Sequence, residues 1–359
     1  MFNEKRGDVS IVSTRTVMII LLIVGFAIAV LFLVYFNLND ISDAEACHNS
    51  IVMRSILRAN KFAEIGPNSL PLKCRTEKYC IQNNLVYDST YQSLEDVCPS
   101  LESTADNRVS EVSLESDTLR ESKDEIEDFL AQKLYECHSV VGEGKANFMP
   151  SESLEKKYCL ICSRIEIDSR LAGDIEKQGG ITYLELFEKM SQKKTKDGQT
   201  YLEYIYGMKD YRTALSTSLE QLKESSRDYS DPLLIEQIQS MTLENWKIPL
   251  MEQSAIITGG IEGGTLRDTL IGVGTGVVVA GAIIAGAFTA GATWATIPGI
   301  ILIAKGTAIG LAAGAATGGP MYVYQTGSDT DFMYIAPTIL PYNVDTLKSL
   351  ECNSFETAP

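Results

Sequence analysis

The chain has 359 residues, and its acidic side chains outnumber its basic ones by 47 to 31, which gives a formal net charge of -16. A surplus of acid of this size excludes a nucleic-acid binder and a domain held on anionic lipid by basic patches. Only His48 and His138 could serve histidine-based hydrolysis, and no pair of carboxylates stands out for acid–base chemistry. We therefore expect a protein that is not an enzyme and that has no cofactor.

An uncharged apolar run, Val17–Phe36, follows a short polar start that carries basic residues. Its length of about 20 residues matches the roughly 30 Å of hydrocarbon that a transmembrane helix crosses, and the basic flank places the N-terminus in the cytoplasm. The alternative is a cleaved signal peptide, because Ala44–Ala46 resembles a cleavage site, but the run exceeds the usual length of about 7 to 15 residues. We predict a cytoplasmic tail over residues 1–15 and an uncleaved transmembrane helix over residues 16–37.

Every cysteine lies beyond this helix, and none lies in an apolar run. An even number of cysteines on one side of a membrane indicates disulfides in an oxidising compartment. We therefore predict an extracytoplasmic α+β domain over residues 38–266, stabilised by disulfides whose connectivity the spacing leaves open. The candidates are Cys47, Cys74, Cys80, Cys98, Cys137, Cys159, Cys162 and Cys352.

The clearest helix of this domain is predicted over residues 118–141, after an earlier helix over residues 41–64. A Thr-x-x-Glu capping box opens it, and an apolar stripe at the helical period follows. The next residues, Gly142–Lys145, have the Gly-x-Gly-Lys pattern that also occurs in phosphate-binding loops. They lack the remaining spacing of such a loop, so we predict that these glycines end the helix.

The residues 158–167 predict a strand. On strict alternation, one face of this strand carries Cys162, and the other carries Cys159, Ile161, Ile165 and Ile167. Further along the chain, helices are expected over residues 181–193, 210–225 and 232–246, and a strand is expected over residues 333–335.

The pair Cys159-x-x-Cys162 has two further interpretations. A thiol oxidoreductase needs a thiolate of lowered pKa, usually at a helix N-terminus, whereas this pair lies in a predicted strand with its sulfurs pointing in opposite directions. A zinc site would draw on these two residues with Cys137 and His138, but neighbouring residues of a helix point in different directions. We predict structural disulfides to other cysteines and no metal site, and keep the oxidoreductase as a distant alternative.

A second apolar region fills most of residues 267–320, where Lys305 is the only charged residue between Asp268 and Asp329. Its small residues recur at every fourth position, a spacing that lets helix backbones approach closely in lipid. We therefore predict a transmembrane hairpin of two helices, over about residues 270–292 and 299–318. The expected helix-packing positions are Gly272, Gly276, Ala280, Gly306, Gly310, Gly314 and Gly318.

Two questions about this hairpin stay open at the level of sequence. Lys305 either reaches the lipid headgroups along its apolar stem or places its charge in a polar lumen. The hairpin is either permanently inserted or stored in the soluble domain until activation. A segment over residues 321–359 then lies on the exterior side, which keeps Cys352 in one compartment with the other cysteines.

The anchor, the stretch Cys137-His138 with GEGKANF at residues 142–148, and KYCLICSRI at residues 157–165 resemble membrane-anchored proteins of small-genome archaea. The likeness lies mostly within residues 118–168, with an echo near Pro341–Cys352. The resemblance implies a prokaryotic exterior location and carries no known activity.

Together these features favour a non-enzymatic integral membrane protein with a structural or interaction role at the cell surface. Its expected partners are the lipid bilayer and other surface proteins or further copies of the chain, and nucleic acid is not among them. The alternative is an oligomeric pore-forming or membrane-remodelling protein that acts through the glycine-rich hairpin.

Overall fold

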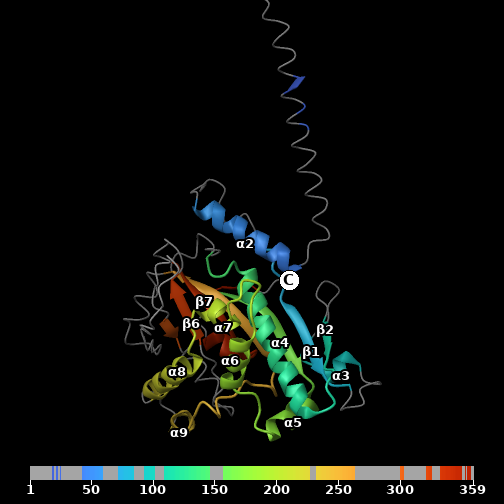
Figure 1. The fold of residues 1–359 in the computed structure, drawn as a ribbon, viewed down its shortest axis with the longest axis vertical. Coiled ribbons are helices and arrows are strands. Elements are labelled where there is room, and N and C mark those ends of the chain that lie inside the picture. The colour runs from blue at the N-terminus through green and yellow to red at the C-terminus, as the bar shows by residue number, and fades with distance from the viewer. Residues whose placement is uncertain are drawn as a thin grey trace, which may run out of the picture.

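The centre of the fold is a mixed β-sheet with helices packed on one face (Figure 1). The computed structural model describes residues 18–19, 22, 25, 43–59, 72–84, 93–101, 109–145, 157–226, 232–262, 300–302, 321–325, 332–349, 352 and 354–356. The strands lie in the order β2-β1-β3-β4-β7-β6-β5, and β8 pairs with β3. Their bounds are β1 Glu77–Gln82, β2 Val109–Ser113, β3 Lys157–Ile167, β4 Ser254–Glu262, β5 Ile300–Leu302, β6 Met321–Gln325, β7 Phe332–Pro341 and β8 Ser354–Glu356.

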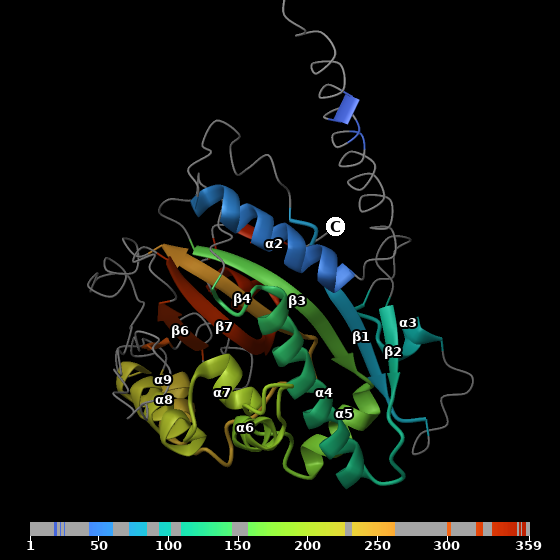
Figure 2. The same cartoon turned by 45° about the horizontal axis from the view of Figure 1, so that its top comes forward.

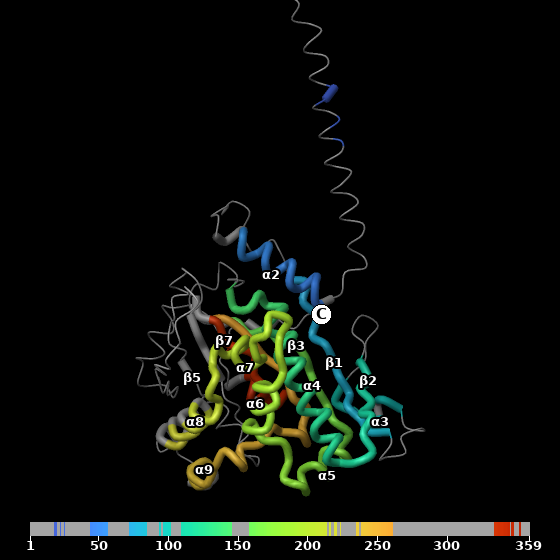
Figure 3. Tube along the Cα trace, viewed as in Figure 1, coloured from blue at the N-terminus to red at the C-terminus, as the bar shows by residue number. Residues whose placement is uncertain are grey.

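The helices α4 to α9 lie together on one side of the sheet, whereas α2 lies at the end where β1 begins (Figures 2 and 3). Side chains of α4 to α7 and the facing side chains of β3, β4 and β7 form the main apolar core. The α+β architecture that we predicted for the exterior domain is thereby confirmed. The helix bounds are α2 Asp43–Ala59, α3 Leu94–Val97, α4 Leu119–Val140, α5 Ser169–Lys177, α6 Tyr183–Gln192, α7 Tyr201–Tyr206, α8 Tyr211–Ser226, α9 Pro232–Gln239 and α12 Val344–Ser349.

Helix α4 forms where its capping box and apolar stripe predicted it. The Thr118 hydroxyl accepts a hydrogen bond from the backbone N–H of Glu121, which satisfies one of the unpaired donors of the first turn. Ile126, Leu130 and Leu134 are buried at the helical spacing, so one face of α4 packs on the sheet. Burial of this stripe, rather than helix propensity alone, holds such a helix in place.

The helix ends at the predicted glycines, in three consecutive residues with left-handed backbone. Gly142, Glu143 and Gly144 have φ angles of 75°, 57° and 69°, a conformation that glycine adopts without steric penalty. A Cβ atom on Gly144 would lie 2.6 Å from the ring of Tyr334 on β7. Glycine is therefore required at this position both by the turn and by the close approach of the ring.

The later helices agree with the sequence in part. α6 and α8 lie within one or two residues of the ranges predicted for them, whereas α9 ends at Gln239 and not near residue 246. The chain beyond α9 turns back to the core, where Trp246 is fully buried. Four short helices, α3, α5, α7 and α12, were not predicted. α7 begins at a capping box formed by Thr200 and Glu203, a local signal that was present in the sequence.

Strand β3 departs from the strict alternation that we predicted. Its pairing with β4 shifts register between Ile161 and Ser163, which marks a β-bulge. Leu160 before the bulge and Ile165 after it both belong to the core beneath the helices. The extra residue reverses the phase of the strand, so the prediction that Cys159 shares a face with Ile165 is wrong.

Strands from the C-terminal part of the chain lie inside the sheet. β7 pairs with β4 and β8 pairs with β3, so strands from residues 321–359 and from residues 38–266 share one sheet. Ile300–Leu302 form β5, which pairs with β6, so the predicted helix over residues 299–318 is wrong at these positions. Branched aliphatic side chains suit a strand, and pairing with β6 satisfies backbone groups. The remaining hairpin positions lie outside the described residues: Gly272, Gly276, Ala280, Lys305, Gly306, Gly310, Gly314 and Gly318.

None of the helices within the described ranges combines the length and the apolar character that a bilayer crossing requires. Most of the predicted anchor over residues 16–37 lies outside those ranges. Of this segment, Met18, Ile19, Leu22 and Gly25 are described as helical, and the three large side chains among them are mostly exposed.

Candidate functional site

All eight cysteines form disulfides, so the predicted disulfide framework is confirmed. Each bond joins a different pair of segments, and β3 takes part in two of them. Disulfides are typical of proteins that fold in oxidising compartments. The pairs are Cys47–Cys74, Cys80–Cys98, Cys137–Cys162 and Cys159–Cys352.

The two cysteines of the Cys-x-x-Cys pair have separate partners. Cys162 is bonded to Cys137 on α4, and Cys159 is bonded to Cys352 just before β8. The separate partners that we predicted for the pair are therefore present. The oxidoreductase alternative requires a bond between Cys159 and Cys162, and the zinc alternative requires their free thiolates. Neither arrangement is present, and no other group of metal-ligating side chains lies within the described residues.

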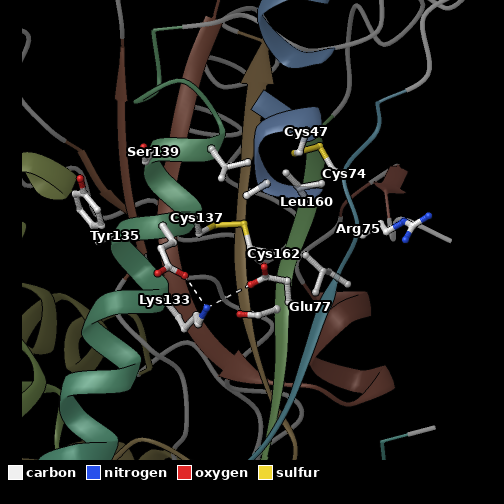
Figure 4. A pocket seen from close by; sticks show the side chains of 15 residues that line it. Cys47, Cys74, Arg75, Glu77, Lys133, Tyr135, Cys137, Ser139, Leu160 and Cys162 are labelled. Atoms are coloured by element: carbon white, nitrogen blue, oxygen red, sulfur yellow. Dashed lines mark hydrogen bonds and ion pairs between the residues drawn. A yellow bond between two sulfur atoms is a disulfide. The ribbon is translucent and has the colours of Figure 1, made fainter. Parts of the chain in front are cut away.

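A cavity of about 180 Å³ lies where α2, α4, β1 and β3 meet (Figure 4). Two of the four disulfides line it: Cys47–Cys74 at the α2 end, and Cys137–Cys162 between α4 and β3. Its remaining walls are apolar on one side and charged on the other. We describe this cavity as the candidate site because charged side chains from α4 and β1 converge on it.

Lys133 of α4 is the centre of the charged side of the cavity. Its ammonium donates hydrogen bonds of 2.6 Å to Glu136 and to the hydroxyl of Tyr79, and lies 3.6 Å from the carboxylate of Glu77. Burial alone would lower the pKa of Lys133, but the bonds to Glu136 and Tyr79 and the charge of Glu77 together raise it. Burial raises the pKa of Tyr79. At neutral pH the site therefore holds a charged ammonium and a neutral phenol.

A second buried polar network fastens α4 to the far strands of the sheet. Nδ1 of His138 lies 3.2 Å from the hydroxyl of Tyr334, and that hydroxyl lies 3.1 Å from Oγ1 of Thr258. Burial lowers the pKa of His138 to about 3, so the ring is neutral at physiological pH. Its contribution to stability is present above about pH 6.5 and is lost as the pH falls toward 3.

The sequence did not reveal the charged cavity. Lys133 and Glu136 have the spacing of an ion pair within a helix, which was visible, but such pairs usually lie on a solvated face. The approach of Glu77 and Tyr79 depends on β1 lying next to β3 in the sheet. That contact joins segments more than 50 residues apart, and no local pattern predicts it.

Glu127 is a third buried titratable residue, on the face of α4 that contacts α6. Its exposed fraction is 7%. Burial and then the charge of Glu185 raise its pKa to about 7, against the opposing charges of Lys123 and Lys189. Folding therefore takes up a proton between about pH 4.5 and 7. The contribution of this group to stability is complete below pH 4.5 and is lost as the pH rises through 7.

We expect Glu127→Gln to be more stable than the wild type by about 2 kcal/mol at pH 8 and nearly equal to it at pH 4.5, because an amide carries no charge to bury. Urea unfolding at both pH values measures the difference. The contribution of His138 to stability has the opposite pH dependence, but it is the same in both proteins and cancels in their difference. Glu188→Gln, at an exposed position on α6, is the control and should show no such pH dependence. A Glu127→Gln difference that stays constant with pH would contradict the prediction.

Comparisons with known proteins identify no relative of this chain: no family model, no curated protein and no solved structure matches it. The resemblance to membrane-anchored archaeal proteins therefore stays a prediction. Function has to be inferred from the residues and their geometry.

Proposed function

We propose that the protein is an integral membrane protein that carries its acidic, disulfide-stabilised domain outside the cytoplasm. The observation that supports this best is that all eight cysteines, which follow the first apolar run in the chain, are paired. Cytoplasmic thiol systems keep cysteines reduced, so a chain with every cysteine paired suits an oxidising compartment. The basic residues before the run suit a cytoplasmic N-terminus.

The described residues of the first apolar run support an anchor. Met18, Ile19 and Leu22 are helical and mostly exposed. Among the residues that the structure describes, no atom of another segment lies within 4 Å of the position that a Cβ on Gly25 would take. Exposing large apolar side chains to water is unfavourable by roughly 25 cal/mol per Å². The same side chains are stable in the hydrocarbon of a bilayer.

We further propose that the exterior domain has a structural or interaction role at the cell surface. Both histidines are held within the fold, since Nδ1 of His48 lies 3.0 Å from the carbonyl oxygen of Val140 and His138 contacts Tyr334. Exposed carboxylates gather on β2 and at the start of α4, where they suit a partner that presents basic groups. These residues are Glu111, Glu115, Asp117, Glu121 and Asp124.

A second candidate function is an oligomeric pore or membrane-remodelling protein. It rests on the four-residue spacing of glycines within residues 267–320 and on Lys305 as the one charge between Asp268 and Asp329. Such a spacing favours close helix packing in lipid. This candidate requires the same anchor and the same exterior domain. It differs in placing residues 267–320 across the bilayer, which requires Ile300–Leu302 to leave their pairing with β6.

Thiol labelling in intact cells tests both candidates. The native cysteines are all paired, so a membrane-impermeant maleimide reports only an introduced thiol. We expect Asp197→Cys, at an exposed turn between α6 and α7, to be labelled in intact cells, and Ser10→Cys to be labelled only after lysis. The protein should also stay with the membranes after an alkaline carbonate wash.

The opposite labelling pattern, or release of the protein by carbonate, would overturn the proposed location. Trp294→Cys and Ser328→Cys then separate the two candidates. Labelling of residue 328 alone in intact cells favours a hairpin across the bilayer and the pore candidate. Labelling of both residues places the glycine-rich segment outside the bilayer and removes the basis of the pore candidate.

A further inference from the structure

The cavity between α2, α4, β1 and β3 contains a polar group with no partner. Ser163 of β3 lines it, is 1% exposed, and its hydroxyl makes no hydrogen bond to any described residue. Buried hydroxyls in native proteins almost always have a partner, so an unpaired one calls for an explanation such as a ligand. A hydroxyl can both donate and accept, so this group is available to either kind of ligand atom.

The β-bulge places Ser163 on the wall of the cavity. The register shift between Ile161 and Ser163 places two successive residues, Cys162 and Ser163, against the cavity. On the neighbouring parallel strand, Glu77 is the register partner of Ser163. A carboxylate and an unpaired hydroxyl therefore lie side by side on the floor of the cavity.

Charges at the cavity leave one carboxylate unbalanced. Lys133 supplies one positive charge, and Glu77 and Glu136 supply two negative charges. Arg75 is exposed, and its guanidinium points away from the other labelled charged groups (Figure 4). In a recess partly screened from water, an excess negative charge favours a cationic ligand over a neutral or anionic one.

Glu77 is the carboxylate that can accept a further hydrogen bond. Both oxygens of Glu136 already accept hydrogen bonds, from Gln132 at 2.9 Å and from Lys133 at 2.6 Å. For Glu77, Oε2 accepts from the hydroxyl of Tyr79 at 2.7 Å, and Oε1 accepts from no described residue. Its side chain is 41% exposed, so a ligand can reach it.

The other side of the cavity is apolar. Val140 and Leu160 line it with the two disulfides, and these groups offer dispersion contacts and no strong hydrogen bonds. The volume of about 180 Å³ is close to that of a cavity of about 150 Å³ that holds benzene. A ligand that fills the cavity therefore has a short apolar tail of a few carbon atoms.

We propose that this cavity binds a small primary amine. Its ammonium group donates to Oε1 of Glu77 and to Oγ of Ser163, and its short apolar tail lies against Val140, Leu160 and the disulfides. This site is independent of the location proposed for the domain, because it depends only on contacts within the fold.

Isothermal titration of the full-length, detergent-solubilised protein at pH 7 tests the proposal with three probes of similar size. Butylammonium should bind at least tenfold more tightly than n-butanol, and butyrate should bind more weakly still. Glu77→Gln should weaken butylammonium binding at least tenfold, and Ser163→Ala about fivefold. Ser169→Ala and Glu188→Gln, at exposed positions outside the cavity, should leave the affinity unchanged.

Stability of the variants separates loss of a ligand contact from loss of the fold. Ser163→Ala removes an unpaired buried hydroxyl, so without ligand it should unfold at a urea concentration equal to or above that of the wild type. Butanol binding as tightly as butylammonium, absence of binding by all three probes, or unchanged affinity in a folded Glu77→Gln variant would each overturn the proposal.

Discussion

Replacing Gly259 by alanine is expected to destabilise the domain by about 3 kcal/mol or more, because the added Cβ would overlap the carbonyl oxygen of Tyr158 on β3. Gly259 lies in β4, in the middle of the sheet, where it pairs with Cys159 on one side and Ile335 on the other. The obstructing atom belongs to the backbone, so no side-chain rotation relieves the overlap. β4 cannot move away from β3 without disturbing its pairing with β7.

Urea unfolding followed by circular dichroism measures this effect, with Gly173→Ala as the matched control. Gly173 lies in α5, and a Cβ there would meet only the sulfur of Met251 at 4.0 Å. Alanine in a helix interior is favoured over glycine by about 0.5 to 1 kcal/mol, so the control should be unchanged or more stable. Similar urea midpoints of unfolding for the two variants would contradict the prediction, because they would show that β4 can shift away from β3 at Gly259.

Replacing both Cys159 and Cys352 by serine is expected to cost about 5 kcal/mol of stability, more than removing any other disulfide of the chain. This bond joins residues separated by 193 positions, whereas the separations of the other three are 27, 18 and 25. Cross-linking a loop restricts the unfolded chain by an amount that grows with loop length, to about 4.7 kcal/mol for 100 residues. The bond also holds β8 beside β3, where only three residue pairs form the contact.

The double variant Cys80→Ser with Cys98→Ser is the control, because its loop is the shortest of the four and its loss should be about 3 kcal/mol. Urea unfolding under non-reducing conditions compares the two. Hydrogen exchange supplies a local readout, since the amides of residues 158–160 should exchange faster only when Cys159 and Cys352 are replaced. Equal stability losses, or unchanged exchange in β3, would contradict the expected role of this bond.

Local features of the sequence determined several parts of the structure. The start of α4 was predictable because the Thr118 hydroxyl accepts from the backbone N–H of Glu121, although the Glu121 carboxylate accepts from that hydroxyl and not from a backbone N–H as the capping box predicted. Its end was predictable because Gly142 and Gly144 adopt left-handed backbone. The presence of disulfides followed from an even number of cysteines placed beyond the first apolar run. The groups that cap α4 are close in sequence, and the presence of disulfides can be inferred without knowing which cysteines pair.

Only the tertiary structure decided the connectivity and the cavity. The partners of Cys159 and Cys162 depend on β8 pairing with β3 and on α4 lying close to it. Strict alternation failed there because the bulge between Ile161 and Ser163 adds one residue to the strand. Glu77 meets Lys133 because β1 lies beside β3 beneath α4. These contacts join segments that are far apart in the chain. They stabilise the fold only once the sheet has formed, so no local pattern of residues predicts them.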